Sequence, residues 1–228
     1  MWYNETKKPR SIIWSGQKAK LHMTELEKML KGLIYDPNEP TLLELRKKAH
    51  SLCREYNQTP EEGEKTRSEI LKKLGIKLGE NVYLTGPINF DYGCFTEIGD
   101  NSYANFNLTV LDVCPVKIGK NVFMGTGVTI VTPLHPLRWQ ERNLYSPKPG
   151  YITDDEYGKP IVIEDNCWIA SNVTICGGVT IGSGSVIGAG SVVTKSIPAG
   201  SLAFGNPCKV KRQITDADVV GENLRYKD

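Results

Sequence analysis

IEDNCW-IASNVT-ICGGVT-IGSGSV-IGAGSV-V, residues 163 to 193, carries an aliphatic residue at every sixth position. The recurring residues are Ile163, Ile169, Ile175, Ile181, Ile187 and Val193. A six-residue period fits neither the 3.6-residue repeat of an α-helix nor the alternation of a hairpin sheet. It predicts a mainly β fold, the parallel β-helix of hexapeptide repeats. In such a coil of near-identical turns, each aliphatic side chain points inward and stacks on its equivalent in the next turn.

The same period begins at Leu78 and is interrupted before the regular stretch. Two extra residues precede Ile98 and another two precede Ile118, and we expect small bulges at the corners of the coil to absorb them. The pattern stops after Ile130 and returns at Ile163. We therefore predict a β-helix over 78–200 with a long loop at 131–160. Loops longer than about 12 to 15 residues in a compact domain are usually functional or disordered.

Residues 23–77 are expected to form a small helical unit. Thr24 and Glu27 have the spacing of a capping box. A second helix should begin after Pro40, and a third at Thr59–Glu62, where a proline suits the first turn. The remaining segments are 1–22, an extension of uncertain order, and 201–228, a C-terminal segment in which Thr215 or Asp216 would cap a short helix.

Composition excludes several classes of protein. The 228 residues are 39% hydrophobic and 24% charged, with a net charge of +2, which argues against a nucleic-acid partner. No stretch approaches the roughly 20 apolar residues of a membrane span, so no membrane partner is expected. The first residues lack the features of a signal peptide, which predicts a cytoplasmic protein. The six cysteines form no CxxC pair and are interpreted as buried, reduced thiols.

His135 is the strongest candidate for catalysis among three histidines. It precedes Pro136 at the root of the long loop, and histidine suits general-base chemistry near neutral pH. His22 lies in the extension, and His50 falls among lysines, where a solvated helix face is expected. A zinc site would need about three histidines in the coil, so no metal is expected. Carboxylates on coil turns are usually solvated, and Asp91, Asp112 and Glu156 lie in or beside the coil.

Two clusters near the end of the coil have competing interpretations. The first is a group of basic residues, which is either ordinary surface charge or a binding site for the phosphates of an anionic cofactor. Its members are Lys195, Lys209, Lys211 and Arg212. The glycines from Gly182 to Gly190 superficially resemble a dinucleotide fingerprint. The six-residue repeat already explains them, and no βαβ unit surrounds them.

Several short motifs together resemble the maltose and galactoside O-acetyltransferases, which belong to the hexapeptide-repeat acyltransferases. They are YANFN at 103–107, LDVCP at 111–115, HP at 135–136, EYGKP at 156–160 and GNP at 205–207. The resemblance covers about residues 23 to 213. It implies a left-handed parallel β-helix and a homotrimer with active sites between neighbouring coils. It also implies acetyl-CoA as co-substrate and direct acetyl transfer to a hydroxyl of a sugar acceptor.

The resemblance also implies roles for individual residues. His135 matches the general base, and Glu156 matches a glutamate that orients it. Acceptor-binding positions correspond to Asp36, Asp91, Tyr103 and Asn105. Coenzyme-binding positions correspond to Trp168, Ser171, Ala189, Thr194, Lys195, Lys209 and Arg212.

Two departures bear on the acceptor. Val113 stands where galactoside enzymes carry a second aspartate, which favours a maltose- or glucose-type acceptor. The segment from Trp139 to Asp155 is longer than usual, either as a surface insertion or because its aromatic residues stack on a sugar or reshape the acceptor pocket. Two other functions remain open. One is acetyl transfer to an antibiotic hydroxyl, an amino sugar or serine; the other is a non-catalytic β-helix scaffold, which the pairing of His135 with Glu156 disfavours.

Overall fold

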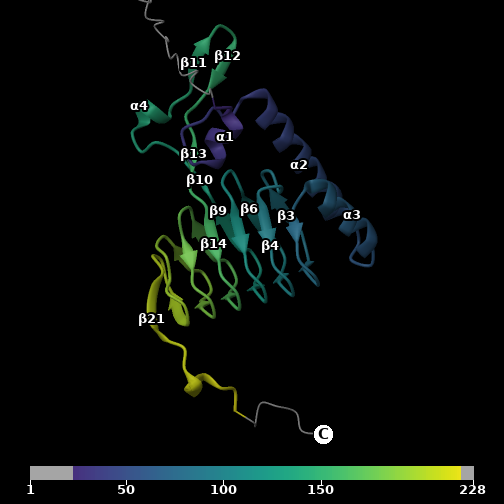
Figure 1. Ribbon diagram of the computed structural model, residues 1–228, viewed down its shortest axis with the longest axis vertical. Coiled ribbons are helices and arrows are strands. Elements are labelled where there is room, and N and C mark those ends of the chain that lie inside the picture. The colour runs from purple at the N-terminus through teal and green to yellow at the C-terminus, as the bar shows by residue number, and fades with distance from the viewer. Residues whose placement is uncertain (1–22, 222–228) are drawn as a thin grey trace, which may run out of the picture.

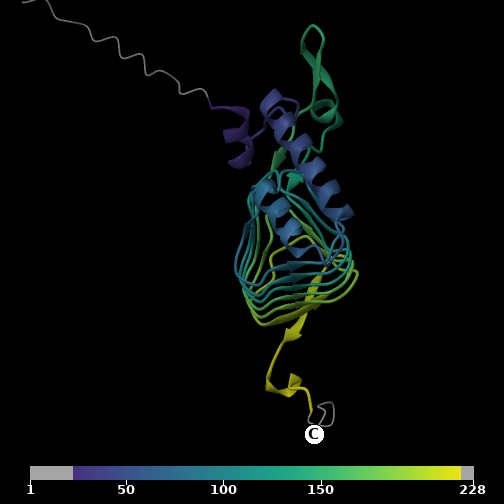
Figure 2. The same cartoon turned by 90° about the vertical axis from the view of Figure 1, so that its right-hand side faces the viewer.

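A computed structural model describes residues 23–221 of the chain. Its body is a parallel β-helix, and Figure 2 shows the turns nested as a three-sided prism. The first side contains β1 (Lys77–Leu78), β4 (Thr96–Ile98), β7 (Val116–Ile118), β14 (Ile161–Ile163) and β17 (Thr180–Ile181). The second contains β2 (Tyr83–Leu84), β5 (Tyr103–Ala104), β8 (Phe123–Met124), β15 (Trp168–Ile169), β18 (Val186–Ile187) and β20 (Ser201–Phe204). The third contains β3 (Ile88–Phe90), β6 (Leu108–Leu111), β9 (Thr129–Val131), β16 (Thr174–Cys176) and β19 (Val192–Val193).

The six-residue period sets the register of the stacked strands, as the sequence predicts. Ile163 lies beside Ile118 in the preceding turn and beside Ile181 in the following turn. Ile175 pairs in the same way with Ile130. All of these side chains are buried in the prism. A mainly β fold with parallel coils is therefore confirmed.

Asparagine side chains organise the corner between the first and second sides. Asn81, Asn101, Asn121 and Asn166 occupy equivalent corners, and each has a positive φ between 53° and 61°. Asparagine tolerates this left-handed conformation better than other non-glycine residues. Their amides also stack, since Asn121 donates to Asn166 at 3.2 Å. Gly184 takes the next corner of the series, with φ 67°.

The extra residues before Ile98 and Ile118 lie at the corner between the third and first sides. Asp112 holds this corner, because its Oδ1 accepts hydrogen bonds from the main-chain N–H groups of Tyr92 and Gly93. Thr96 donates its hydroxyl to Oδ2 at 2.9 Å. The expectation that Asp112 is solvated is wrong, since its side chain is fully buried. Three donors offset part of the cost of removing the carboxylate from water.

The helical unit closes the N-terminal end of the prism (Figure 1). It comprises α1 (Glu25–Leu30), α2 (Pro40–Gln58) and α3 (Glu64–Leu74). Thr24 and Glu27 form the predicted capping box. The predicted start of the third helix at Thr59 is wrong, because Thr59 terminates α2 and donates its hydroxyl to the carbonyl oxygen of Glu55. Gly63 instead precedes α3.

The predicted loop at 131–160 is largely ordered and projects beyond the helical unit (Figure 1). Its root is an antiparallel pair, β10 (Pro133–Leu134) and β13 (Tyr157–Gly158). Between them lie α4 (Trp139–Arg142) and the hairpin of β11 (Tyr145–Lys148) and β12 (Tyr151–Thr153). We call residues 135–156 the arm.

The chain leaves the coil through β21 (Lys209–Gln213), which runs antiparallel to β20. A 3-10 turn at Asp216–Asp218 follows, capped by Thr215 as predicted. All six cysteines are free, and four are buried. Within 23–221, no helix has the length and apolar character needed to cross a membrane. His22 and the predicted extension at 1–22 lie outside the described residues.

Ile175→Ala is expected to lower the free energy of unfolding by about 2–5 kcal/mol, because its side chain is fully buried and a cavity would remain. Urea unfolding followed by circular dichroism measures this loss. Thr174→Ala, on the outer face of the same strand, is the control and should change stability by less than about 0.5 kcal/mol. Equal losses in the two variants would contradict the inward stacking.

Asp112→Asn is expected to change how stability depends on pH. Burial raises the pKa of Asp112 from 3.8 to about 6. The folded protein therefore holds this proton more tightly than the unfolded chain, and the stabilisation is lost as pH rises through about 6. Asparagine cannot titrate. The stability of the natural protein relative to the variant should consequently fall between about pH 4 and pH 6, as measured by urea unfolding across that range.

Candidate functional site

His135 follows β10 at the base of the arm, and its side chain is 44% exposed. Two acceptors lie near one of its ring nitrogens. Nδ1 is 3.4 Å from the main-chain oxygen of Asp155 and 3.5 Å from Oδ2 of Asp154. Among the described residues, Nε2 makes no hydrogen bond. The imidazole is thus engaged on one side and available on the other.

Glu156 begins the short segment that enters β13, and it is bound to Tyr35 rather than to His135. The Tyr35 hydroxyl donates to Oε1 of Glu156 at 2.7 Å, and the Tyr35 N–H donates to the Glu156 carbonyl at 2.9 Å. Burial raises the pKa of the Glu156 carboxyl, whereas the hydrogen bond from Tyr35 and the charge of His135 lower it. His135 therefore influences this carboxylate electrostatically, without a direct hydrogen bond in the structure.

Asp91 is part of a polar hollow beside α2. Its Oδ1 lies 3.5 Å from Nε2 of His50, and burial raises the pKa of Asp91 while His50 lowers it. The hollow has a volume of about 270 Å³ and is lined by His50, Cys53, Arg54, Asn57, Asn89, Phe90, Asp91 and Leu111. Sequence reasoning assigned His50 to a solvated face and missed this pairing. No local signal could have found it, because the two residues lie on different elements.

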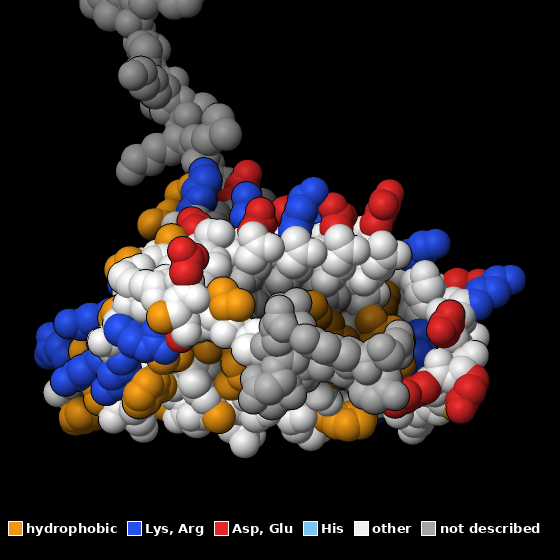
Figure 3. All heavy atoms as spheres, turned by 90° about the horizontal axis from the view of Figure 1, so that it is seen from below, with side chains coloured by type: hydrophobic (Ala, Val, Ile, Leu, Met, Phe, Trp, Pro, Cys, Tyr) orange, Lys and Arg blue, Asp and Glu red, His pale blue; other side chains and the backbone are white. Residues whose placement is uncertain are grey.

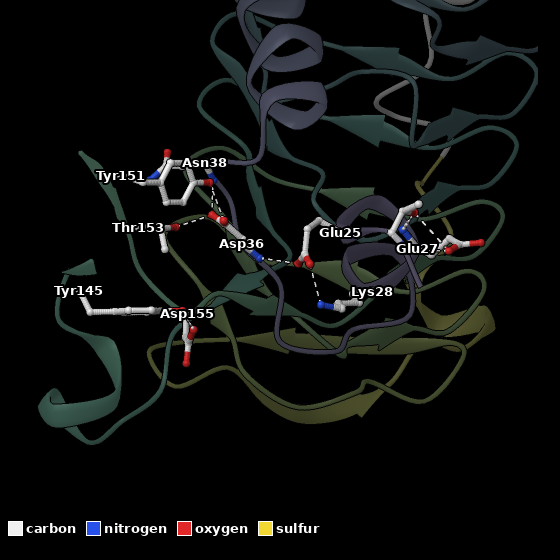
Figure 4. A network of polar contacts seen from close by, with 10 residues as sticks. Glu25, Glu27, Lys28, Asp36, Asn38, Tyr145, Tyr151, Thr153 and Asp155 are labelled. Atoms are coloured by element: carbon white, nitrogen blue, oxygen red, sulfur yellow. Dashed lines mark hydrogen bonds and ion pairs between the residues drawn. The ribbon is translucent and has the colours of Figure 1, made fainter. Parts of the chain in front are cut away.

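Asp36 lies between α1 and α2 and is bound to the arm. Figure 4 shows Tyr151 and Thr153 directed at its carboxylate. Tyr151 donates to Oδ2 at 2.5 Å, Thr153 donates to Oδ1, and the Asn38 N–H donates to Oδ1 at 2.9 Å. The Asp36 N–H in turn donates to Glu25 at 2.8 Å. Both oxygens of the carboxylate are therefore engaged within the chain.

Tyr103 and Asn105 lie at the second side of the prism, whereas His135 leaves from the third. Tyr103 stacks on Tyr83 with ring centroids 6.2 Å apart, and its hydroxyl accepts from Thr85 at 3.0 Å. Asn105 accepts from the main-chain N–H of Phe106. The structure of one chain consequently does not bring these two predicted acceptor residues to His135.

The predicted coenzyme residues follow the second side and its corners toward the C-terminal end. Trp168 is 54% exposed and continues an outward column formed by Tyr83, Tyr103 and Phe123 in successive turns. Ser171 is partly buried just after β15. Three further predicted positions are exposed near the last turns of the coil, and they are Ala189, Thr194 and Lys195.

Basic residues gather on β21, and Figure 3 shows Lys and Arg side chains clustered at one end of the molecule. Lys209 is exposed, and the Nζ of Lys211 lies 4.7 Å from the centre of the Phe204 ring. Arg212 is already paired with Asp218 through two contacts of 2.6 and 2.7 Å. In the described part of the chain, no group of His, Cys, Asp or Glu residues has a metal-binding arrangement.

Two protein-family models match this chain, one in the helical unit and one in the coil. The family described as "Maltose acetyltransferase hexapeptide capping motif" matches residues 28–74. The family described as "Bacterial transferase hexapeptide (six repeats)" matches residues 160–195. The first of these is the helical unit and the second is the most regular part of the coil.

Individual relatives extend the similarity over most of the chain. The galactoside O-acetyltransferase of Escherichia coli is 40% identical, over 91% of this chain and 97% of the relative. The crystal structure of a maltose O-acetyltransferase from Clostridium difficile is 42% identical, with a TM-score of 0.78 and coverage of 85% and 99%. A hexapeptide-repeat acetyltransferase from Vibrio cholerae, complexed with acetyl-CoA, is 36% identical, with a TM-score of 0.74 and coverage of 85% and 100%. The chain therefore belongs to the hexapeptide-repeat acetyltransferases, in the group that contains the maltose and galactoside O-acetyltransferases.

Proposed function

We propose that this protein transfers the acetyl group of acetyl-CoA to a hydroxyl of a sugar, with His135 as the general base. The observation that carries the proposal is the environment of the imidazole. Nδ1 faces the Asp155 main-chain oxygen and the Asp154 carboxylate, whereas Nε2 makes no hydrogen bond within 23–221. A neutral histidine with its proton on Nδ1 presents Nε2 as the proton acceptor.

The reaction is a direct transfer. Nε2 of His135 takes the hydroxyl proton as the acceptor oxygen attacks the thioester carbonyl carbon. The carbon–sulfur bond then breaks, the acetyl ester remains on the acceptor, and the imidazolium returns the proton to the leaving thiolate. Positioning of the two reactants supplies much of the acceleration, since well-oriented reactants contribute about 7–11 kcal/mol.

Acetyl-CoA would lie along the second side of the prism. Two similar solved structures are complexes with acetyl-CoA and with coenzyme A, which supports acetyl-CoA as the co-substrate. Trp168 offers an exposed ring beside the pantetheine arm, with Ser171, Ala189 and Thr194 further along. The phosphates would meet the cationic end of the coil, formed by Lys195, Lys209 and Arg212. Arg212 must then exchange its bond with Asp218 for a phosphate oxygen, for which its fork-shaped guanidinium is suited.

A homotrimer would complete the site. Asn105 and Trp168 lie on the second side of the prism, while His135 leaves from the third. A copy of the chain that places its second side against the arm of a neighbour brings the base, the coenzyme and Asn105 together. Sedimentation should therefore give three times the chain mass of 25.3 kDa.

The acceptor would enter from the corner beside Asp91. The hollow of about 270 Å³ is rich in hydrogen-bonding groups, as recognition of sugar hydroxyls requires. Val113 is buried among the residues of the helical unit and offers no carboxylate. This supports a maltose- or glucose-type acceptor over a galactoside.

His135→Ala is expected to lower acetyl transfer by at least about 100-fold, because a general base typically contributes 10²–10⁴-fold. The measurement is acceptor-dependent release of free coenzyme A, detected by thiol trapping, with maltose, glucose, galactosides, amino sugars and chloramphenicol in parallel. Coenzyme affinity, measured by calorimetry, should survive in the variant. Turnover close to that of the natural protein would exclude His135 as the base, and binding without release for every acceptor would favour a scaffold.

Tyr35→Phe is expected to destabilise the protein more at pH 8 than at pH 4. The Tyr35 hydroxyl lowers the pKa of the buried Glu156 carboxyl, so its removal raises that pKa further. A raised folded-state pKa gives stability that is present at low pH and lost as pH rises through it. Loss of the donor should cost about 1–3 kcal/mol at pH 8 in urea unfolding. A loss that is equal at both pH values would contradict an ionised Glu156.

A further inference from the structure

The arm is held against the helical unit on both sides of Asp154. Tyr35 binds Glu156 through its main chain and its hydroxyl, and Asp36 accepts the hydroxyls of Tyr151 and Thr153. The Asn38 amide adds a bond of 3.2 Å to the carbonyl of Ile152. We call the contacts between residues 35–38 and residues 151–156 the clamp. Figure 4 shows its contacts between Asp36 and the side chains of Tyr151 and Thr153.

Asp154 lies inside the clamp and faces His135. Its side chain is only 20% exposed, and its Oδ2 is 3.5 Å from Nδ1 of the imidazole. The neighbouring Asp155 directs its carboxylate elsewhere and accepts from the Tyr145 hydroxyl at 3.0 Å. Glu156 is occupied by Tyr35. In the described part of the chain, Nδ1 makes its hydrogen bond with the main-chain oxygen of Asp155, at 3.4 Å. Of these three successive carboxylates, Asp154 is the one that lies within ion-pair distance of the same nitrogen.

We propose that Asp154 is a positioning residue for His135, and that Asp36 sets it in place through the hydroxyls of Tyr151 and Thr153. The inference rests on His135 being the general base of the proposed function. An acceptor at Nδ1 fixes both the orientation of the ring and its neutral tautomer, and so leaves Nε2 free for the hydroxyl proton.

The clamp also assigns a function to the arm, which is to hold the carboxylate of Asp154 in place. Thr153 is almost fully buried, and the Asp36 N–H is anchored by Glu25, which is itself paired with Lys28 at 2.6 Å. Charge-assisted hydrogen bonds of this kind are stronger than neutral ones. Residues 151–153 of the arm are therefore fixed to a rigid helical base, and the carboxylate that follows them is fixed with them.

The first test reads the tautomer of His135 directly. Full-length protein labelled with ¹⁵N at histidine contains three imidazoles, and His135→Ala identifies the relevant signals. At a pH where the ring is neutral, His135 should appear as the Nδ1–H tautomer, and Asp154→Asn should give a mixture with the Nε2–H form. An unchanged tautomer in Asp154→Asn would overturn the proposal. This readout needs no turnover, so it stands even if no sugar proves to be an acceptor.

The second test measures kinetics. Asp154→Asn should lower kcat about 10- to 100-fold with little change in the KM for acetyl-CoA, since a general base is worth about 10²–10⁴-fold in all. Asp154→Glu should recover part of the loss. The control is Glu141→Gln, which removes a carboxylate of the same arm whose side chain, among residues 23–221, is paired only with Arg138. An Asp154→Asn variant within about 2-fold of the natural kcat would contradict the positioning role.

A double-mutant cycle separates the two roles of Asp36. If Asp36 acts through Asp154, Asp36→Asn lowers kcat and the double variant is hardly worse than Asp154→Asn alone. If Asp36 binds the acceptor, its substitution raises the acceptor KM and the two effects multiply. The latter result would overturn the proposed clamp while leaving His135 as the base. If His135 is not the general base, His135→Ala would keep full activity. That result would contradict the proposed function and not the clamp alone.

Discussion

The stacking of aliphatic side chains every sixth residue is the interaction on which the rest of the structure depends. Ile163, Ile169 and Ile175 each point into the prism and lie on equivalents from neighbouring turns. Burial of apolar surface at about 25 cal/mol per Å² favours the coil, and the parallel ladders satisfy the main chain. The outward-facing side chains therefore do not need to pack in the core. Trp168 and the lysines of β21 can be exposed without cost to the core.

Several residues of the proposed site lie where the six-residue period is interrupted. The interruptions after β3, β6 and β9 all fall at one corner of the prism, between its third and first sides. Asp91, Asp112 and His135 belong to these interruptions. A regular coil offers only short turns at its corners, so inserted residues provide the concave, polar surroundings that a site needs. The helical unit then covers this corner and supplies Tyr35, Asp36 and His50.

Periodicity and capping patterns account for what the sequence predicts well. The coil, the capping box at Thr24 and the base of the arm at His135 are all local signals, readable within a few residues. The surroundings of His135 are not local. Tyr35 and Glu156 are 121 positions apart, and Asp36 and Tyr151 are 115 apart. Nothing in the sequence distinguishes Asp154 from Asp155, because their different contacts depend on which way two adjacent side chains point.

Strand β21 determines how the second side of the coil ends. A parallel coil could in principle be continued by the strands of another copy, since its last turn presents unpaired main-chain groups. Here the chain reverses, and β21 runs antiparallel along β20 with Lys209, Lys211 and Arg212 on it. A charged edge strand of opposite direction is a poor template for further pairing. The same residues that make the end of the coil cationic thus cover the end of its second side.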